Sequence, residues 1–167
     1  MNVRPSDEPA VIVRPATVED APVLGRLGAL LVRLHHELDA ERFLPATPNT
    51  EQGYAAWLRS QVAAPDVVVL VAERKGEVVG YVYGGVEGHD WMALRGPAGV
   101  LHDLIVDPAH RGHGIGRLLL DAAVAALRAR GAPRAVLSTA ARNEAAQRLV
   151  ARAGRRSRAA AWSGRAR

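Results

Sequence analysis

A glycine-rich turn between an apolar strand and a helix constrains the fold of this chain more than any other stretch. Residues 101–106 are apolar enough for a buried strand, which Asp107 and Pro108 end because proline has no N–H to donate to a strand ladder. Alternating glycines follow, and an apolar helical pattern begins directly after them (Gly112, Gly114 and Gly116). Another apolar run lies at residues 135–139, so the order strand, helix, strand predicts a βαβ unit with parallel strands.

A turn of this kind is suited to binding an anion. Glycine lets the backbone adopt positive φ and approach a ligand with no Cβ in the way. The first N–H groups of the helix point toward the same space, and the helix dipole there is worth roughly 0.3–2 kcal/mol to an anion. The backbone N–H groups of residues 113–117 are the expected donors, and Arg111 and Arg117 add formal charge.

The spacing of the turn narrows the choice of anion. It differs from the G-x-G-x-x-G of dinucleotide-binding proteins, and it lacks the Lys-Ser/Thr pair of a Walker loop. The sequence therefore argues against NAD, and against ATP phosphates bound in a Walker loop.

The same segment resembles the acetyl-CoA pyrophosphate loop of the GNAT N-acetyltransferase superfamily. The family pattern, Arg/Gln-x-x-Gly-x-Gly/Ala after a strand and at the start of a helix, is complete from Arg111 to Gly116. Asn143, Ala146, Leu149 and Gly154 resemble the next motif of the family, so the resemblance covers about residues 11–154. It implies acetyl-CoA as co-substrate, no metal, and an amine of a small molecule or peptide as acceptor.

The resemblance also implies roles for individual residues. The backbone of Leu104 and Val106 would pair with pantetheine as a strand does, and the Val106 N–H would face the thioester oxygen. Asn143 and Ala146 would line the pantetheine arm. The expected cofactor-binding residues are Leu104, Ile105, Val106, Arg111, Gly112, His113, Gly114, Ile115, Gly116, Arg117, Asn143 and Ala146.

Composition and charge predict a single domain. The chain has 167 residues, 49% of them hydrophobic, and no cysteine, so thiolate chemistry and disulfides are excluded. Its net charge of +5 comes from the end of the chain, because residues 151–167 hold six arginines and no acidic residue. This distribution argues against a nucleic-acid-binding face on the domain. The predicted organisation is a flexible lead (1–10), one GNAT-like domain (11–154) and an arginine-rich tail (155–167).

The periodicity of apolar residues predicts an α/β fold with a mixed, mostly antiparallel central sheet flanked by helices. The hairpin at residues 67–85 makes part of the sheet antiparallel, with Val79, Tyr81 and Tyr83 expected on one face. The expected strands are 11–13, 67–73, 78–85, 101–106 and 135–139, and the expected helices are 17–38, 50–64, 116–130 and 143–154. No secretory signal or apolar run of membrane-spanning length is evident, so a cytoplasmic protein with no membrane partner is expected.

Acetyl transfer to an amine needs a group that removes a proton from the amine. His102 and Glu87 are equally favoured as this base, each against a purely structural role. Asp103 is expected to point to the face opposite His102. Tyr54 and Trp57 either form a wall of the acceptor site, as the resemblance implies, or pack in the core.

The chain departs from the family pattern in its last third. Many members carry a tyrosine that protonates the departing CoA thiolate, whereas this chain has Val150 at that position. Tyr81, Tyr83 or water is expected to replace it. Residues 155–162 also lack the pattern of the strands that usually close the sheet, and an unfinished edge would favour a homodimer.

Alternative functions follow from these departures. The chain could be a non-catalytic acyl-CoA-binding regulatory module, which Val150 and the unusual C-terminal segment favour. Nucleic-acid binding through the arginine tail is a weaker alternative, since a run of charges is usually solvated.

Overall fold

The structure is a computed structural model that describes residues 10–154. The flexible lead, the arginine-rich tail and the question of closing strands after Gly154 therefore lie outside the described residues, apart from Ala10. Within this range the element order follows the predicted order throughout.

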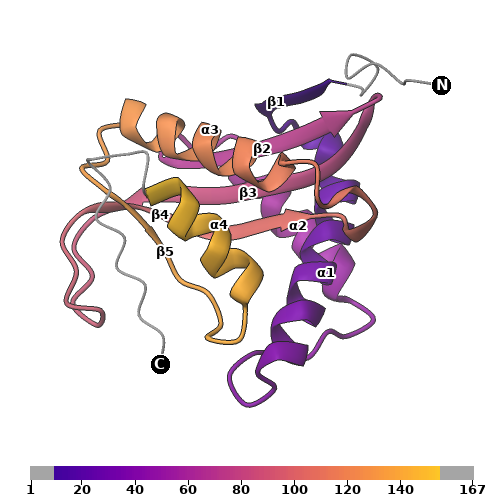
Figure 1. The fold of residues 1–167 in the computed structure, drawn as a ribbon, viewed down its shortest axis with the longest axis horizontal. Helices are drawn as coiled ribbons and strands as arrows, with labels where there is room; N and C mark the ends of the chain where they lie inside the picture. Colours follow the sequence, from indigo (N-terminus) through magenta and orange to yellow (C-terminus); the bar gives the residue numbers. More distant parts are fainter. Residues whose placement is uncertain (1–9, 155–167) are drawn as a thin grey trace.

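One five-stranded sheet forms the centre of the fold, with the strands side by side in chain order (Figure 1). The first four strands pair antiparallel with one another, and the fourth pairs parallel with the fifth. The predicted fold class is thus confirmed. The strands are β1 (Val11–Pro15), β2 (Val67–Arg74), β3 (Glu77–Glu87), β4 (Ala98–Val106) and β5 (Ala135–Leu137).

Helices connect and cover these strands, and their ends follow local sequence signals. Asp20 accepts a 2.8 Å hydrogen bond from the Thr17 N–H, which closes the short turn before the first helix. Gly114, with φ of 74°, precedes the third helix directly. The helices are α1 (Ala21–Leu38), α2 (Thr50–Gln61), α3 (Ile115–Ala129) and α4 (Glu144–Gly154), with short 3₁₀ turns η1 (Val18–Asp20) and η2 (Pro108–His110).

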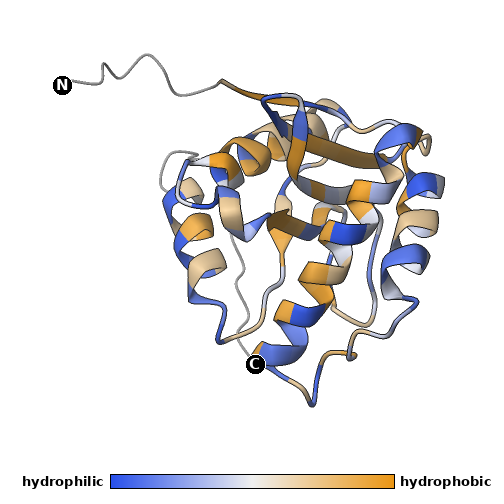
Figure 2. Cartoon of the chain, turned by 90° about the vertical axis from the view of Figure 1, so that its right-hand side faces the viewer, coloured by the Kyte–Doolittle hydropathy of each residue, from blue (hydrophilic) through white to orange (hydrophobic). Residues whose placement is uncertain are grey.

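Apolar residues pack in separate layers on the two faces of the sheet. Between the sheet and the α1–α2 pair lie Leu24, Leu27, Leu31, Leu58, Val69, Val71, Tyr81 and Ile105. On the opposite face α3 contributes most of a second layer, comprising Val68, Ala72, Val82, Leu101, Ile115, Leu119, Leu120, Ala123 and Leu127. Figure 2 shows the matching pattern, with hydrophobic colours along the strands and mixed colours around the helices.

Two β-bulges interrupt the strict alternation that the sequence predicts. Between β2 and β3 the register shifts next to Glu73, so Val79 packs in the α3 layer while Tyr81 packs in the α1–α2 layer. The expectation that Val79 shares a face with Tyr81 and Tyr83 is therefore wrong. A bulge adds an unpaired residue, and the side chains that follow it change faces.

The second bulge lies in β4. Leu101 pairs with Gly84 and Asp103 with Tyr83, which leaves His102 as the extra residue. The His102 ring lies 5.5 Å from that of Tyr83, which is also the register partner of Asp103. The expectation that Asp103 points to the face opposite His102 is wrong for this reason.

Glycines in α1 allow α2 to approach closely. A Cβ at Gly28 would clash with the Tyr54 ring, whereas a Cβ at Gly53 of α2 would meet nothing within 4 Å. We expect Gly28→Ala to destabilise the fold by about 1–3 kcal/mol through overpacking. The control Gly53→Ala should stabilise it by about 0.5–1 kcal/mol, because alanine is the better helix former. Urea unfolding measures both, and similar gains from the two variants would contradict the close packing described here.

Candidate active site

The sheet opens on the β5 side of β4. β5 pairs with β4 only from Gly99 to Leu101, so the backbone of residues 102–106 has no strand partner on that side within residues 10–154. A cleft of about 500 Å³ lies there, between β4 on one side and the segment after β5 with α4 on the other. Leu104 and Val106, the residues expected to pair with pantetheine as a strand does, lie on this edge of β4.

The cleft begins at the glycine-rich turn. Gly112 and Gly114 have φ of 86° and 74°, and a Cβ at either position would meet nothing within 4 Å. The first N–H groups of α3 point out of the helix at this end. The Arg117 N–H is an exception, since it donates to the Gly114 carbonyl at 3.0 Å and is not a free donor. The predicted row of donors, residues 113–117, stays a prediction, in which the Arg117 N–H also has an intrahelical acceptor.

All but one of the predicted cofactor-binding residues line this cleft. His113 does not, and its Nδ1 lies 3.3 Å from the His110 carbonyl oxygen. Asn143 lines the cleft and also caps α4, because its Oδ1 accepts a 3.1 Å hydrogen bond from the Ala146 N–H. The predicted residues that line the cleft are Leu104, Ile105, Val106, Arg111, Gly112, Gly114, Ile115, Gly116, Arg117, Asn143 and Ala146.

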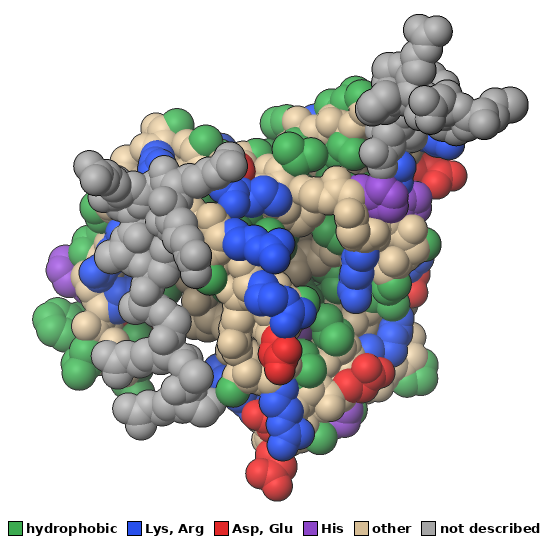
Figure 3. All heavy atoms as spheres, viewed as in Figure 1, with side chains coloured by type: hydrophobic (Ala, Val, Ile, Leu, Met, Phe, Trp, Pro, Cys, Tyr) green, Lys and Arg blue, Asp and Glu red, His purple; other side chains and the backbone are tan. Residues whose placement is uncertain are grey.

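Arginine side chains from three segments border the cleft. Figure 3 shows basic side chains in a line beside a hollow on the face that α3 and α4 cover. Arg111 donates to the Val106 carbonyl at 3.0 Å, and Arg117 pairs with Asp121 at 2.6 Å. Arg148 and Arg152 of α4 also line the cleft and were not predicted, although their spacing of one helical turn was the available signal. The cleft is thus suited to a polyanionic ligand.

A histidine–carboxylate pair lies at the other end of the cleft. His102 Nε2 is 2.6 Å from Glu87 Oε1, and Arg95 donates to the second oxygen of Glu87 at 2.8 Å. Both side chains remain partly exposed, His102 at 44% and Glu87 at 37%. The structure therefore brings together the two residues that the sequence analysis proposed separately as the base.

Tyr81, the third predicted catalytic residue, lies elsewhere. Its side chain is fully buried, and its hydroxyl donates to Asp103 Oδ2 at 2.8 Å. Tyr54 donates to the same oxygen at 2.7 Å. Burial raises the pKa of Tyr81 and of Asp103, and the tyrosine hydrogen bonds lower the pKa of Asp103 in part. Tyr81 lines neither hollow of this site.

Aromatic rings connect α2 to the His102 end of the cleft. The Trp57 and Tyr83 centroids are 4.8 Å apart, and those of Tyr83 and His102 are 5.5 Å apart. Trp57 is 40% exposed, whereas Tyr54 is committed to Asp103. Tyr54 and Trp57 were expected either to form a wall of the acceptor site or to pack in the core. Of the two, Tyr54 mainly holds α2 on the sheet.

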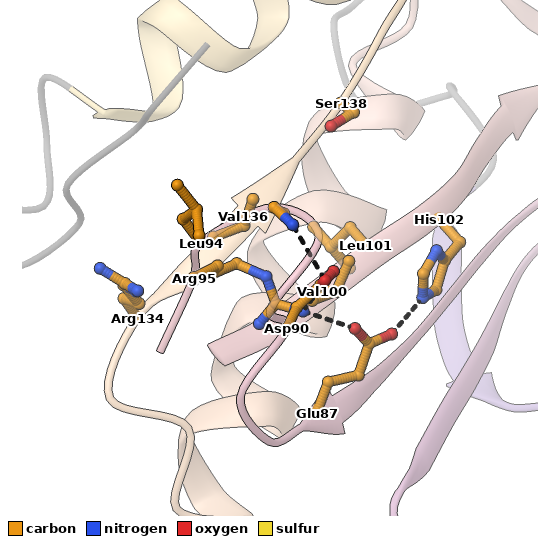
Figure 4. Close-up of a pocket in the computed structure, with 11 residues that line it drawn as sticks. Glu87, Asp90, Leu94, Arg95, Val100, Leu101, His102, Arg134, Val136 and Ser138 are labelled. Carbon is orange, nitrogen blue, oxygen red and sulfur yellow. Dashed lines mark hydrogen bonds and ion pairs between the residues drawn. The ribbon is translucent and has the colours of Figure 1, made fainter. Parts of the chain in front are cut away.

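A second hollow of about 520 Å³ adjoins the first (Figure 4). Its lining includes Glu87 and Arg134, and it shares His102 and Ser138 with the cleft. Ser138 and Arg134 could not be predicted as site residues, because nothing local distinguishes them from other residues at strand ends. The cleft from the glycine-rich turn and the second groove thus adjoin at His102 and Ser138.

The comparison with protein families agrees with this geometry. The acetyltransferase (GNAT) family matches residues 31–154, a range that contains the whole cleft and the Glu87–His102 pair. The chain belongs to the GNAT family. The resemblance stated from the glycine-rich turn is thereby confirmed.

Curated GNAT-like relatives match parts of this chain. Mycothiol acetyltransferase of Thermobispora bispora is 40% identical over 84 residues, 48% of this chain and 27% of that protein. An acetyltransferase of Sodalis glossinidius is 40% identical over 81 residues, 48% of this chain and 51% of that protein. The matched region thus spans about half or less of these relatives.

A solved structure covers more of the GNAT fold. The ribosomal-protein-alanine N-acetyltransferase of Brucella melitensis has a TM-score of 0.68 and 28% identity, over 86% of this chain and 83% of that one. Within residues 10–154, no helix is long and apolar enough to cross a membrane. The same part of the chain contains no group of three or more side chains placed to hold a metal ion.

Proposed function

We propose that this protein transfers an acetyl group from acetyl-CoA directly to a primary amine of a small molecule or peptide. The observation that carries the proposal is the continuous cleft from the glycine-rich turn to His102. One end offers an anion site and the other a proton acceptor. The space between them is bordered by the unpaired edge of β4.

The donor would lie along this cleft. Gly114 and the first turn of α3 would hold the pyrophosphate, because free N–H groups and the helix dipole converge there. The backbone of Leu104 and Val106, which has no strand partner on that side, would hydrogen-bond the pantetheine arm as a strand does. The Val106 N–H would then meet the thioester oxygen and stabilise the oxyanion that develops on it.

The Glu87–His102 pair would act as the general base. If His102 Nε2 donates its proton to Glu87 at 2.6 Å, Nδ1 is left as the proton acceptor. The carboxylate would also stabilise the imidazolium that forms when the amine gives up its proton. His102 lines both the cleft and the adjoining groove, so an amine entering from the groove would reach it before the thioester.

The CoA thiolate would leave with a proton from water. The Tyr81 hydroxyl is buried against Asp103, and the Val150 side chain lines the cleft but has no proton to donate.

We expect Val150→Tyr to raise kcat about 3–10-fold. A general acid that has evolved for this step typically contributes more than this factor. Val150→Phe, which adds the ring without the hydroxyl, is the matched control. An equal gain from both variants would assign the effect to packing.

The test of the proposed function is acetylation itself. Purified protein, acetyl-CoA and a panel of primary amines are incubated, thiol release is followed, and the acetylated amine is identified by mass spectrometry. Transfer to any amine supports the proposal. Tight acetyl-CoA binding without transfer to any amine would favour the non-catalytic acyl-CoA-binding module instead.

A further inference from the structure

The groove beside the Glu87–His102 pair changes in chemistry from one end to the other. Val100 of β4 pairs with Val136 of β5, and both are half-buried on its floor. Ser138 and Arg134 lie two residues to either side of Val136, and all three line the groove. The floor therefore runs from His102 and Ser138, through a pair of valines, to an arginine.

A braced loop between β3 and β4 forms the wall of the groove. Asp90 and Arg95 exchange backbone hydrogen bonds of 2.8 and 2.9 Å, and Asp90 Oδ1 accepts from the N–H groups of Met92 and Ala93 at 3.0 Å. This loop holds Leu94 and Arg95 against the groove (Figure 4). The groove is thus shaped before any acceptor enters.

Arg134 differs from the other charged side chains of the groove. Glu87 pairs with His102 and Arg95, and Arg95 also lies 3.7 Å from Asp90. Within residues 10–154 Arg134 has no ion pair, and its hydrogen bond to the Gly96 carbonyl is long, at 3.5 Å. Its guanidinium donors are therefore available to an anion in the groove.

We infer that the acceptor is an amine that carries a carboxylate at the far end of an apolar spacer, with Arg134 selecting that carboxylate. This inference rests on the proposed function and names the substrate class of the same site. The three residues of β5 separate Arg134 from Ser138, so the two Cα atoms are four steps apart, or roughly 13 Å at 3.3 Å per residue. The amine would lie at the Glu87–His102 pair, the spacer on Val100 and Val136, and the carboxylate at Arg134.

Two kinds of molecule carry an amine and a distant carboxylate: an ω-amino acid and a short peptide with a free C-terminus. Trialanine and 8-aminooctanoate separate them. A preference for trialanine assigns the groove to peptides, and a preference for 8-aminooctanoate assigns it to small molecules. Both outcomes keep the carboxylate requirement.

The decisive experiment compares 8-aminooctanoate, octylamine and 1,8-diaminooctane, which differ only at the far end. Wild-type kcat/KM should favour the carboxylate about tenfold, mainly through KM, as expected for a charge-assisted hydrogen bond. Arg134→Gln should remove this preference, and Arg134→Glu should reverse it toward the diamine. Arg33→Gln removes an exposed charge outside both hollows and should keep the wild-type order.

Distinct results would overturn the inference. Equal kcat/KM for the three acceptors, or an unchanged carboxylate preference in folded Arg134→Glu protein, would refute the role of Arg134 while the proposed function stands. Acetyl-CoA binding without acetylation of any acceptor would refute the proposed function and this inference with it. Thermal unfolding of each variant shows that a loss is not a loss of the fold.

Discussion

Replacement of Gly114 by glutamate is expected to weaken acetyl-CoA binding at least about 100-fold, or by about 2.7 kcal/mol. Gly114 has φ of 74° and precedes α3, where the space next to its Cα is empty. A glutamate would fill that space and place a negative charge where the pyrophosphate is proposed to bind. Calorimetric titration with acetyl-CoA measures the loss.

A matched control exists at Gly76. It has φ of 79°, equally open surroundings, and a place in the β2–β3 turn outside both hollows. Gly76→Glu therefore introduces the same backbone strain and the same charge away from the cleft. We expect it to bind acetyl-CoA like the wild type. Equal losses in the two variants would show that the effect is general destabilisation, and tight binding by Gly114→Glu would remove the turn from the cofactor site.

Removal of the imidazole of His102 is expected to lower kcat about 100-fold or more, the usual contribution of a positioned base. Glu87→Gln should lower it by less, because the imidazole stays while the carboxylate at 2.6 Å is lost. Steady-state kinetics over a range of pH measures both. In His102→Ala the rate should rise with pH throughout, since only free amine and hydroxide then remain to drive the step.

The double variant tests whether the two residues act as a unit. Glu87→Gln combined with His102→Ala should be no slower than His102→Ala alone, because Glu87 acts through the imidazole. His89→Gln is the control, as His89 is exposed and lines neither hollow. Full additivity of the two losses, or an equal loss in the control, would contradict the pairing.

Much of the fold could be predicted because its signals are local. Period-two and helical patterns placed every strand and helix within a few residues, and the glycine-rich turn predicted the α3 end of the cleft. The exact register of the strand pairs could not be predicted from these local patterns. The bulges at Val79 and His102 reversed the expected faces of Val79 and Asp103, since a bulge depends on both strands and leaves no mark in either one alone.

In the candidate site, too, some features have local sequence signals and others depend on contacts between distant residues. The turn, the strand before it and the helix after it could be predicted from the sequence alone, because glycine spacing and apolar periodicity act between near neighbours. Three other features appear only in the folded chain: Glu87 contacts His102 across 15 positions, Tyr81 donates to Asp103, and Arg134 lines the same groove. These contacts join separate strands, and the pairing register that creates them is fixed by the whole sheet.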